Sequence, residues 1–172
     1  MKIKGILISL SLLLSIGCAA QPDMLKKEEK LIWYTDMMKA NEVSSASGKP
    51  LFAFFTGSDW CPWCIKLQKD VFAKPEFIKW AEKNVVLVEL DFPRNKKLNP
   101  ELTKQNRDLQ QAFQVKGFPI VWMFFLHKNA RDMNYTIEGL GSLGYPSGAE
   151  RGQEELKFLK EANILLEKRT VK

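Results

Sequence analysis

The sequence predicts a single α/β domain in which a mixed central sheet of about four strands is flanked by helices. Two observations lead to this fold class. Short apolar runs of the kind that are buried in a sheet alternate with longer amphipathic segments along most of the chain. Residues 18–172, which follow a removable N-terminal segment, are enough for one domain with a core but too few for two ordinary domains.

The N-terminal segment, residues 1–17, has the features of a secretion signal of the lipoprotein type. Two lysines precede an apolar run over residues 6–16, which is too short to be a permanent membrane-spanning helix. Residues 15–18, Ser-Ile-Gly-Cys, resemble the lipobox of bacterial lipoproteins, although that motif usually begins with Leu. The resemblance implies that Cys18 is lipidated and anchors the chain to a membrane. Cleavage one or two residues later, without lipidation, is the alternative.

The basic charge of the chain does not indicate a nucleic-acid-binding protein. The formal net charge is +6, and two of the positive charges belong to the signal segment. The densest basic group, Arg94, Lys96 and Lys97, is typical of a solvated loop. We therefore expect no nucleic-acid partner.

Residues 18–46 are expected to form a tether and an additional N-terminal helix. From residue 23 to about residue 45 the chain is rich in helix-forming residues, and the apolar side chains of Leu31, Tyr34 and Met38 recur at helical spacing. A segment rich in Ser, Gly and Pro then ends the helix. We place the main domain at residues 47–172.

The first half of this domain predicts two buried strands and two helices. Residues 51–55 are almost wholly apolar, as in a strand buried on both faces of a sheet. After a turn, a helix begins at Cys61 with Pro62 in the first helical position, where the missing N–H does no harm. A second helix over residues 76–83 and a β-branched strand over residues 85–90 follow.

The second half predicts two helices and two further strands. Residues 101–113 form a helical segment, residues 117–119 break it, and residues 120–126 form a third apolar strand. A shorter, alternating strand over residues 134–138 leads into a glycine-rich turn. Residues 153–168 form an amphipathic helix.

Cys61 and Cys64 are the residues from which we expect chemistry. At a helix start, unpaired backbone N–H groups and the helix dipole stabilise a thiolate, so we expect an exposed Cys61 with a lowered pKa to be the nucleophile. Cys64 lies three positions later on the same helical face, one turn deeper, and can attack a mixed disulfide formed at Cys61. If Cys18 is lipidated, the odd count of three cysteines leaves this one pair.

From residue 51 to about residue 168 the chain resembles the thioredoxin superfamily, which has a three-layer fold. The resemblance is greatest to bacterial exported thioredoxin-like lipoproteins and to the C-terminal domain of the membrane thiol–disulfide interchange reductase. It is carried by the first strand, by Asp59-Trp60-Cys61 with Cys64, and by residues 117–119, Gly-Phe-Pro.

The resemblance implies the surroundings of the dithiol. Pro119 is expected to follow a cis peptide bond and, with the backbone of Phe118, to hold an incoming peptide beside Cys61. Trp60 is expected to shield one side of the site. Trp63 either contacts the substrate or covers the helix start.

The chain departs from the family at Phe55. Many thioredoxins have a buried acid at this position, six residues before the first cysteine, which is thought to help move the proton of the second thiol. Here that proton must pass through water or through another group. Asp59 lies nearer to the motif and is a weaker candidate for proton transfer.

The function that the resemblance implies is thiol–disulfide exchange with protein substrates in the bacterial cell envelope. Apart from the Cys61–Cys64 disulfide, no cofactor is expected. The expected partners are thiol- or disulfide-containing envelope proteins. An upstream membrane electron donor is a further possible partner. Trp63 offers Cys61 no cationic group, which favours a reductant or isomerase over a strong oxidant.

The alternative function is client binding. In that case the thioredoxin scaffold holds clients through the apolar face around Trp60, Trp63, Phe118 and Pro119, and the redox chemistry is incidental.

Other interpretations of single motifs are less favoured. A zinc site normally needs four ligands, and beyond the cysteine pair the chain offers only His127, which we interpret as a turn residue. Haem attachment needs His directly after Cys64, where the chain has Ile65. A purely structural role for the Cys61–Cys64 disulfide is a further alternative. Residues 139–144 match G-x-G-x-x-G, but no helix follows, so we expect a turn rather than a dinucleotide site.

Overall fold

The structure is a computed structural model and describes residues 31–129 and 134–168. The predicted signal segment and Cys18 lie outside the described residues. The strands are β1 (Trp33–Tyr34), β2 (Leu51–Thr56), β3 (Val86–Asp91), β4 (Ile120–Lys128) and β5 (Tyr135–Leu143). The helices are α1 (Met37–Ser47), α2 (Pro62–Leu67), the π-helical turn η1 (Gln68–Phe72) that continues α2, α3 (Pro75–Asn84), α4 (Pro100–Ala112) and α5 (Glu154–Glu167).

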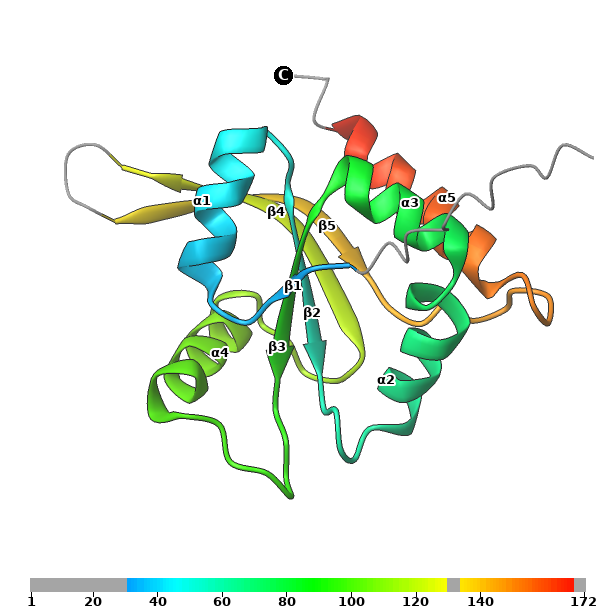
Figure 1. Cartoon of the computed structure of the whole chain (residues 1–172), viewed down its shortest axis with the longest axis horizontal. Coiled ribbons are helices and arrows are strands. Elements are labelled where there is room, and N and C mark those ends of the chain that lie inside the picture. The colour runs from blue at the N-terminus through cyan, green and yellow to red at the C-terminus, as the bar shows by residue number, and fades with distance from the viewer. Residues whose placement is uncertain (1–30, 130–133, 169–172) are drawn as a thin grey trace, which may run out of the picture.

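The five strands form one mixed sheet in the order β1-β3-β2-β4-β5 (Figure 1). Strands β1, β3 and β2 are parallel, whereas β4 runs antiparallel to β2, and β5 antiparallel to β4. The α/β fold class with a mixed sheet is therefore confirmed, with one strand more than predicted. The register pairs Leu51 with Val86 and Thr56 with Asp91, so β2 and β3 end side by side.

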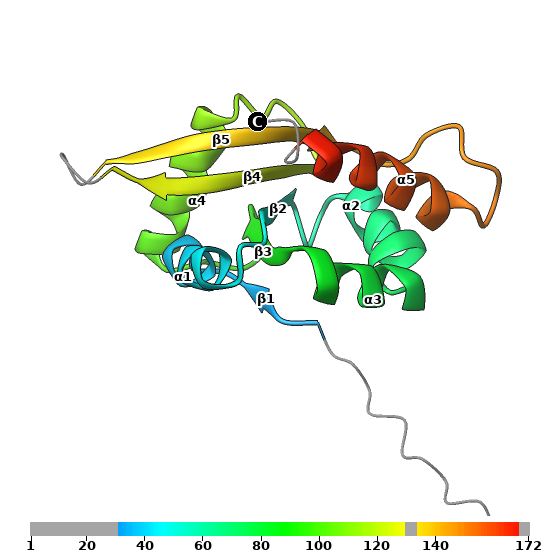
Figure 2. The same cartoon turned by 90° about the horizontal axis from the view of Figure 1, so that it is seen from above.

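Helices cover both faces of this sheet (Figure 2). One face carries α1 and α4, and the other carries α2, α3 and α5. In β2, Phe52 and Phe54 belong to the buried cluster on the α2 side, while the side chains between and around them belong to the cluster on the α1 side. All six residues of β2 are buried, which confirms the prediction of a strand covered on both faces.

An aromatic cluster fixes α2 and η1 on the sheet. The ring of Phe52, which is fully buried, has its centroid 5.7 Å from that of Phe72 in η1 and 6.2 Å from that of Phe158 in α5. Leu67 and Val71 on the same helical stretch are also fully buried. Burial of aromatic and aliphatic side chains of this kind dominates core stability. The helical segment formed by α2 and η1, which begins at the dithiol, is therefore held against the sheet.

The predicted N-terminal helix is partly wrong. Tyr34 lies in β1, where it pairs with Val88, and α1 begins only at Met37. The start is set by Asp36, whose side chain accepts hydrogen bonds from the N–H groups of Met38 and Lys39 as an N-cap. Strand pairing thus overrides the helical spacing of the apolar residues. The start of the main domain at residue 47 stays a prediction.

Two assignments near the β4–β5 hairpin are also wrong. His127 is not a turn residue but lies in β4, with Nε2 2.8 Å from Oε2 of Glu138 on β5. The glycine-rich run is mostly strand, because β5 extends to Leu143. Gly141 has φ +145°, and a Cβ there would lie 2.7 Å from Cδ2 of Leu165, so the glycine allows α5 to approach the strand.

Glu89 is the only residue of β3 that is not buried. It pairs with Phe54 and lines a hollow with Gln68 and Phe72 on the α2 side of the sheet. Burial raises the pKa of this carboxyl above its usual value, and the nearby charge of Asp91 raises it further.

We predict that Glu89→Gln raises the free energy of unfolding at pH 7. The folded-state pKa lies above the unfolded value, so ionisation costs stability as the pH rises through the folded pKa. That cost is absent below the unfolded pKa of about 4.3. Urea denaturation at pH 7 and below pH 4 should show the gain only at pH 7. The control is Glu42→Gln, at an exposed position of α1. A variant no more stable than the wild type at pH 7 would contradict the prediction.

Candidate active site

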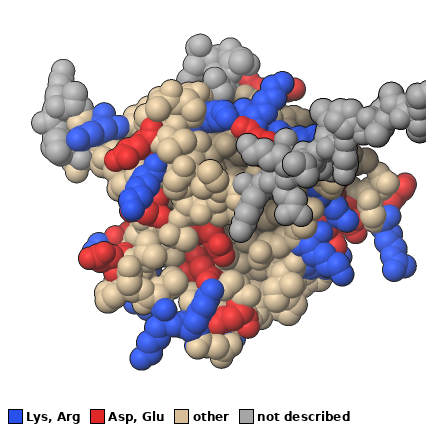
Figure 3. Space-filling view, in the orientation of Figure 1, with Lys and Arg blue, Asp and Glu red and all other residues tan. Residues whose placement is uncertain are grey.

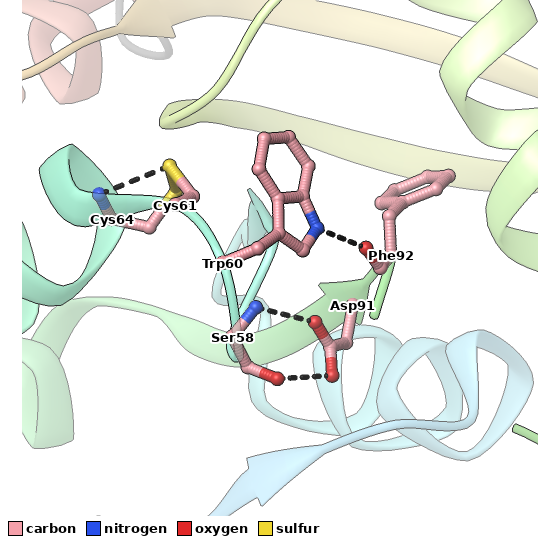
Figure 4. The surroundings of a disulfide bond; sticks show 6 residues. All are labelled: Ser58, Trp60, Cys61, Cys64, Asp91 and Phe92. Atoms are coloured by element: carbon pink, nitrogen blue, oxygen red, sulfur yellow. Dashed lines mark hydrogen bonds between the residues drawn. A yellow bond between two sulfur atoms is a disulfide. The ribbon is translucent and has the colours of Figure 1, made fainter. Parts of the chain in front are cut away.

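The two cysteines lie at the start of α2 and form a disulfide with a Cα–Cα distance of 5.3 Å. Cys61 is the N-cap of the helix, and Pro62 is its first residue, as predicted. The backbone N–H of Cys64 donates to Sγ of Cys61 at 3.2 Å (Figure 4). This N–H belongs to the first turn of the helix and is shared with the backbone oxygen of Cys61 at 3.1 Å. On reduction it faces the sulfur that would carry the negative charge.

Both cysteines are buried in the disulfide form. The exposed fraction is 4% for Cys61 and 0% for Cys64. The expectation that Cys61 is exposed is therefore wrong for this form, because aromatic residues including Trp60, Phe118 and Tyr145 pack against the cluster that contains it. The relative depth of the two residues agrees with the prediction.

The Gly-Phe-Pro segment packs against Trp60, the residue before the dithiol. The peptide bond between Phe118 and Pro119 is cis, which confirms the expectation from the resemblance. The ring centroid of Phe118 is 6.0 Å from that of Trp60 and 5.0 Å from that of Phe92. Phe92 and Phe118, which are far apart in the sequence, thus meet at Trp60.

Trp60 is held in place by the loop after β3. Its indole Nε1 donates to the backbone oxygen of Phe92 at 2.7 Å (Figure 4). The ring lies so close to Gly57 that a Cβ there would be 2.4 Å from Cε2 of Trp60, so any larger residue would displace the indole. The guanidinium of Arg94 lies over the same ring, with Cζ 3.8 Å from the centroid.

Asp91 holds the turn that precedes the dithiol through hydrogen bonds with Ser58. Its carboxylate accepts hydrogen bonds from the backbone N–H of Ser58 at 2.9 Å and from the Ser58 hydroxyl at 2.7 Å (Figure 4). Lys96 approaches the same carboxylate at 3.0 Å. Sequence reasoning missed Asp91, although an acid at the end of a buried apolar strand is itself a signal of a specific polar contact.

Asp59 is bound to the backbone of the β3–α4 loop. Its carboxylate accepts from the N–H of Arg94 at 3.0 Å and from the N–H of Asn95 at 2.7 Å. The hydrogen bond from Arg94 is the main reason that the pKa of this carboxyl is lowered. Asp59 therefore fixes the loop, and the sequence alone gave no reason to expect this.

Trp63 is 55% exposed and lies beside a group formed by Tyr145, Asp70 and Lys66. Its ring packs edge-on against Tyr145, with centroids 5.1 Å apart. The Tyr145 hydroxyl donates to Asp70 at 2.8 Å, and Lys66 pairs with the same carboxylate. The hydrogen bond that Asp70 accepts from Lys66 is the main cause of the lowered pKa of this carboxyl. These contacts of Tyr145 were not predicted, because its partners Asp70 and Trp63 are distant in the sequence.

Phe55 fills the place of the family's buried acid. It is fully buried and its ring lies 6.4 Å from that of Phe92 and 6.0 Å from that of Phe113. The departure noted in the sequence is therefore accommodated by aromatic packing on the α4 side of the sheet.

Across residues 31–129 and 134–168, no group of three or more His, Cys, Asp or Glu side chains is arranged to hold a metal ion. Over the same residues, no helix combines the length and the apolar character needed to cross a membrane. That no metal or cofactor takes part stays a prediction from the sequence.

Two curated relatives come from Chlamydia pneumoniae. The disulfide bond reductase DsbH is 41% identical over 81 residues, which are 47% of this chain and 49% of that protein. The thioredoxin-related protein DsbJ is 29% identical over 141 residues, which are 82% of this chain and 38% of that protein. The chain thus spans about half or less of the curated relatives that it matches.

The fold and a family match agree with these relatives. A solved DsbH oxidoreductase superposes with a TM-score of 0.64 at 26% identity, covering 93% of this chain and 95% of that one. A thioredoxin from Thermus thermophilus, at 20% identity, shares the fold with a TM-score of 0.52 over 77% of this chain and 85% of its own. Residues 37–140, more than half of the sequence, match the thioredoxin-like domain family. The chain belongs to the thioredoxin-like family.

Proposed function

We propose that this chain is a thiol–disulfide oxidoreductase of the bacterial cell envelope that exchanges disulfides with protein substrates through Cys61 and Cys64. The observation that carries the proposal is the disulfide at the start of α2, between an N-cap cysteine and a buried second cysteine. The name of the relative DsbH, a disulfide bond reductase, supports the same chemistry.

The proposed reaction is a two-step exchange. In the reduced protein the Cys61 thiolate attacks one sulfur of a substrate disulfide, and the other substrate sulfur leaves as a thiolate. Cys64 then loses its proton and attacks Sγ of Cys61, which releases the second substrate thiolate and forms the Cys61–Cys64 disulfide. Two electrons pass from the dithiol to the substrate. The N–H of Cys64, 3.2 Å from Sγ of Cys61, stabilises the attacking thiolate.

The surface around the dithiol is the proposed substrate-binding site. Its proposed residues are Trp60, Trp63, Phe118 and Pro119. The proposal is supported by the contact of Phe118 with Trp60, which directly precedes Cys61. Substrates are thiol- or disulfide-containing envelope proteins. A membrane electron donor is the proposed source of the two electrons that reduce the disulfide after each turnover.

Client binding without redox chemistry is the second candidate. It is favoured by the apolar side chains that face solvent beside the dithiol, namely Trp63 and Ile65, which are 55% and 52% exposed. Replacing both cysteines by Ser separates the candidates. If both client binding and the phenotype survived that change, the oxidoreductase proposal would be contradicted.

We predict that Cys64→Ser accumulates a mixed disulfide at Cys61 when it meets an oxidised substrate, because the resolving thiol is missing. Cys61→Ser should form almost none, because Cys64 is fully buried. Turnover in either variant should fall by at least about 10³-fold, as expected when an enzyme loses an essential nucleophile. Non-reducing electrophoresis and mass spectrometry identify the adduct. Equal trapping by both variants would contradict the assigned roles.

The proposed direction of electron flow is reduction or isomerisation. Trp63 lies between the cysteines in sequence and packs against Tyr145, and it brings no cation to the Cys61 sulfur. A strong oxidant needs an unusually stabilised thiolate, for which such a cation is one source.

We predict a reduction potential more negative than about −180 mV, that of protein disulfide isomerase. The potential is measured by equilibration with glutathione. The reduced protein should also reduce a disulfide-bonded substrate faster than the oxidised protein oxidises an unfolded dithiol substrate. A potential near about −120 mV, together with faster oxidation, would reverse the assigned direction.

Export and a lipid anchor at Cys18 complete the proposal. Their support is the basic start, the short apolar run and the lipobox-like residues 15–18.

We predict that the full-length chain, expressed in bacteria, incorporates labelled fatty acid and sediments with membranes. Cys18→Ser should abolish both, whereas Cys61→Ser should keep both. Recovery of unlabelled wild-type protein in the soluble envelope fraction would contradict the lipid anchor.

A further inference from the structure

Arg94 is an exposed residue of the β3–α4 loop whose guanidinium lies over the indole of Trp60, with Cζ 3.8 Å from the ring centroid. Trp60 directly precedes Cys61. A cation therefore lies next to a residue of the proposed substrate-binding site.

The loop that carries Arg94 is fixed on both sides. The backbone oxygen of Phe92 accepts the hydrogen bond from Nε1 of Trp60 at 2.7 Å. The N–H groups of Arg94 and Asn95 donate to the carboxylate of Asp59 at 3.0 and 2.7 Å. These bonds hold the backbone of Arg94 beside the ring, so little conformational entropy is lost when its side chain binds a ligand.

The charge of Arg94 has no acidic partner among residues 31–129 and 134–168. The ion pairs between two residues of this part of the chain are made by lysines and by His127. Two acids of this region have other partners: Asp59 accepts hydrogen bonds from the backbone N–H groups of Arg94 and Asn95, and Asp91 contacts Ser58 and Lys96. A guanidinium that stacks on an aromatic ring keeps the donors in its plane free, and their fork geometry matches a carboxylate.

The surroundings of this site carry charges of both signs. Lys and Arg side chains and Asp and Glu side chains both show at the end of the molecule where the loop after β3 lies (Figure 3). Arg94, rather than a uniformly basic surface, is therefore the cation that a substrate meets beside Trp60.

We propose that Arg94 is a specificity residue that binds an Asp or Glu side chain next to the reactive cysteine of the substrate. The inference rests on the proposed function, because it concerns the substrates of the same dithiol. Preferred substrates then carry an acidic residue beside the cysteine that Cys61 attacks.

The test compares peptides that differ in one side chain. Each peptide is acetylated and amidated, so that it has no terminal carboxylate, and contains one internal disulfide with Glu, Gln or Lys beside the attacked cysteine. Second-order rate constants are measured with the reduced full-length protein. We expect the wild type to prefer Glu to Gln by about 10-fold, the scale of one hydrogen-bonded charge pair, and to disfavour Lys.

The variants assign that preference to one side chain. Arg94→Gln should bring the Glu-to-Gln ratio close to 1, and Arg94→Lys should keep part of it, because it retains charge but loses the planar fork. Lys97→Gln removes the same charge from the same loop and should keep the ratio within about twofold, because exposed charges at longer range are screened by salt. Urea denaturation midpoints confirm that each variant is folded.

The outcomes separate the inference from the proposed function. Reduction of the Glu and Gln peptides at equal rates by the wild type would overturn the role of Arg94 and leave the oxidoreductase intact. A preference that survives Arg94→Gln, or that Lys97→Gln removes equally, would also overturn it. Failure to reduce any peptide would instead count against the proposed function.

Discussion

The parallel pairing of β2 with β3 is the constraint on which the site depends. It sets Thr56 opposite Asp91 at the ends of the two strands, so the turn before the dithiol and the loop after β3 leave the sheet side by side. The carboxylate of Asp91 can then hold Ser58, and the backbone of Phe92 can hold Trp60. A slip of one residue in this register would turn these contacts to the other face of the sheet.

Packing on the α2 side of the sheet complements that register. Phe52, Phe72 and Phe158 link the sheet, η1 and α5 in one aromatic cluster, and the helical stretch that starts at the dithiol is part of it. The helix start therefore has a fixed position relative to both loops. Polar contacts orient the turn and aromatic contacts orient the helix, and Cys61 lies where the two meet.

Sequence patterns predicted the parts of the fold that depend on local chemistry. The apolar run of β2, Pro62 at the first helical position and the proline of the Gly-Phe-Pro segment each carry a local signal that survives in the structure. The parts that were missed depend on partners distant in sequence. Tyr34 is a strand residue because it pairs with β3, and Gly141 is a strand residue because it pairs with Met123 of β4. Contacts such as that of Arg94 with Trp60 leave no pattern in a single sequence.

The position of Cys61 as the N-cap of α2 links electron transfer to helix stability. Its sulfur accepts the N–H bond that a Ser, Asp or Asn oxygen accepts at most helix starts. An ionised acceptor forms a stronger hydrogen bond than a neutral one, so a thiolate caps the helix better than a disulfide sulfur does. Reduction of the disulfide therefore stabilises the first turn of α2. By thermodynamic reciprocity, any change that stabilises this turn also favours the reduced dithiol over the disulfide.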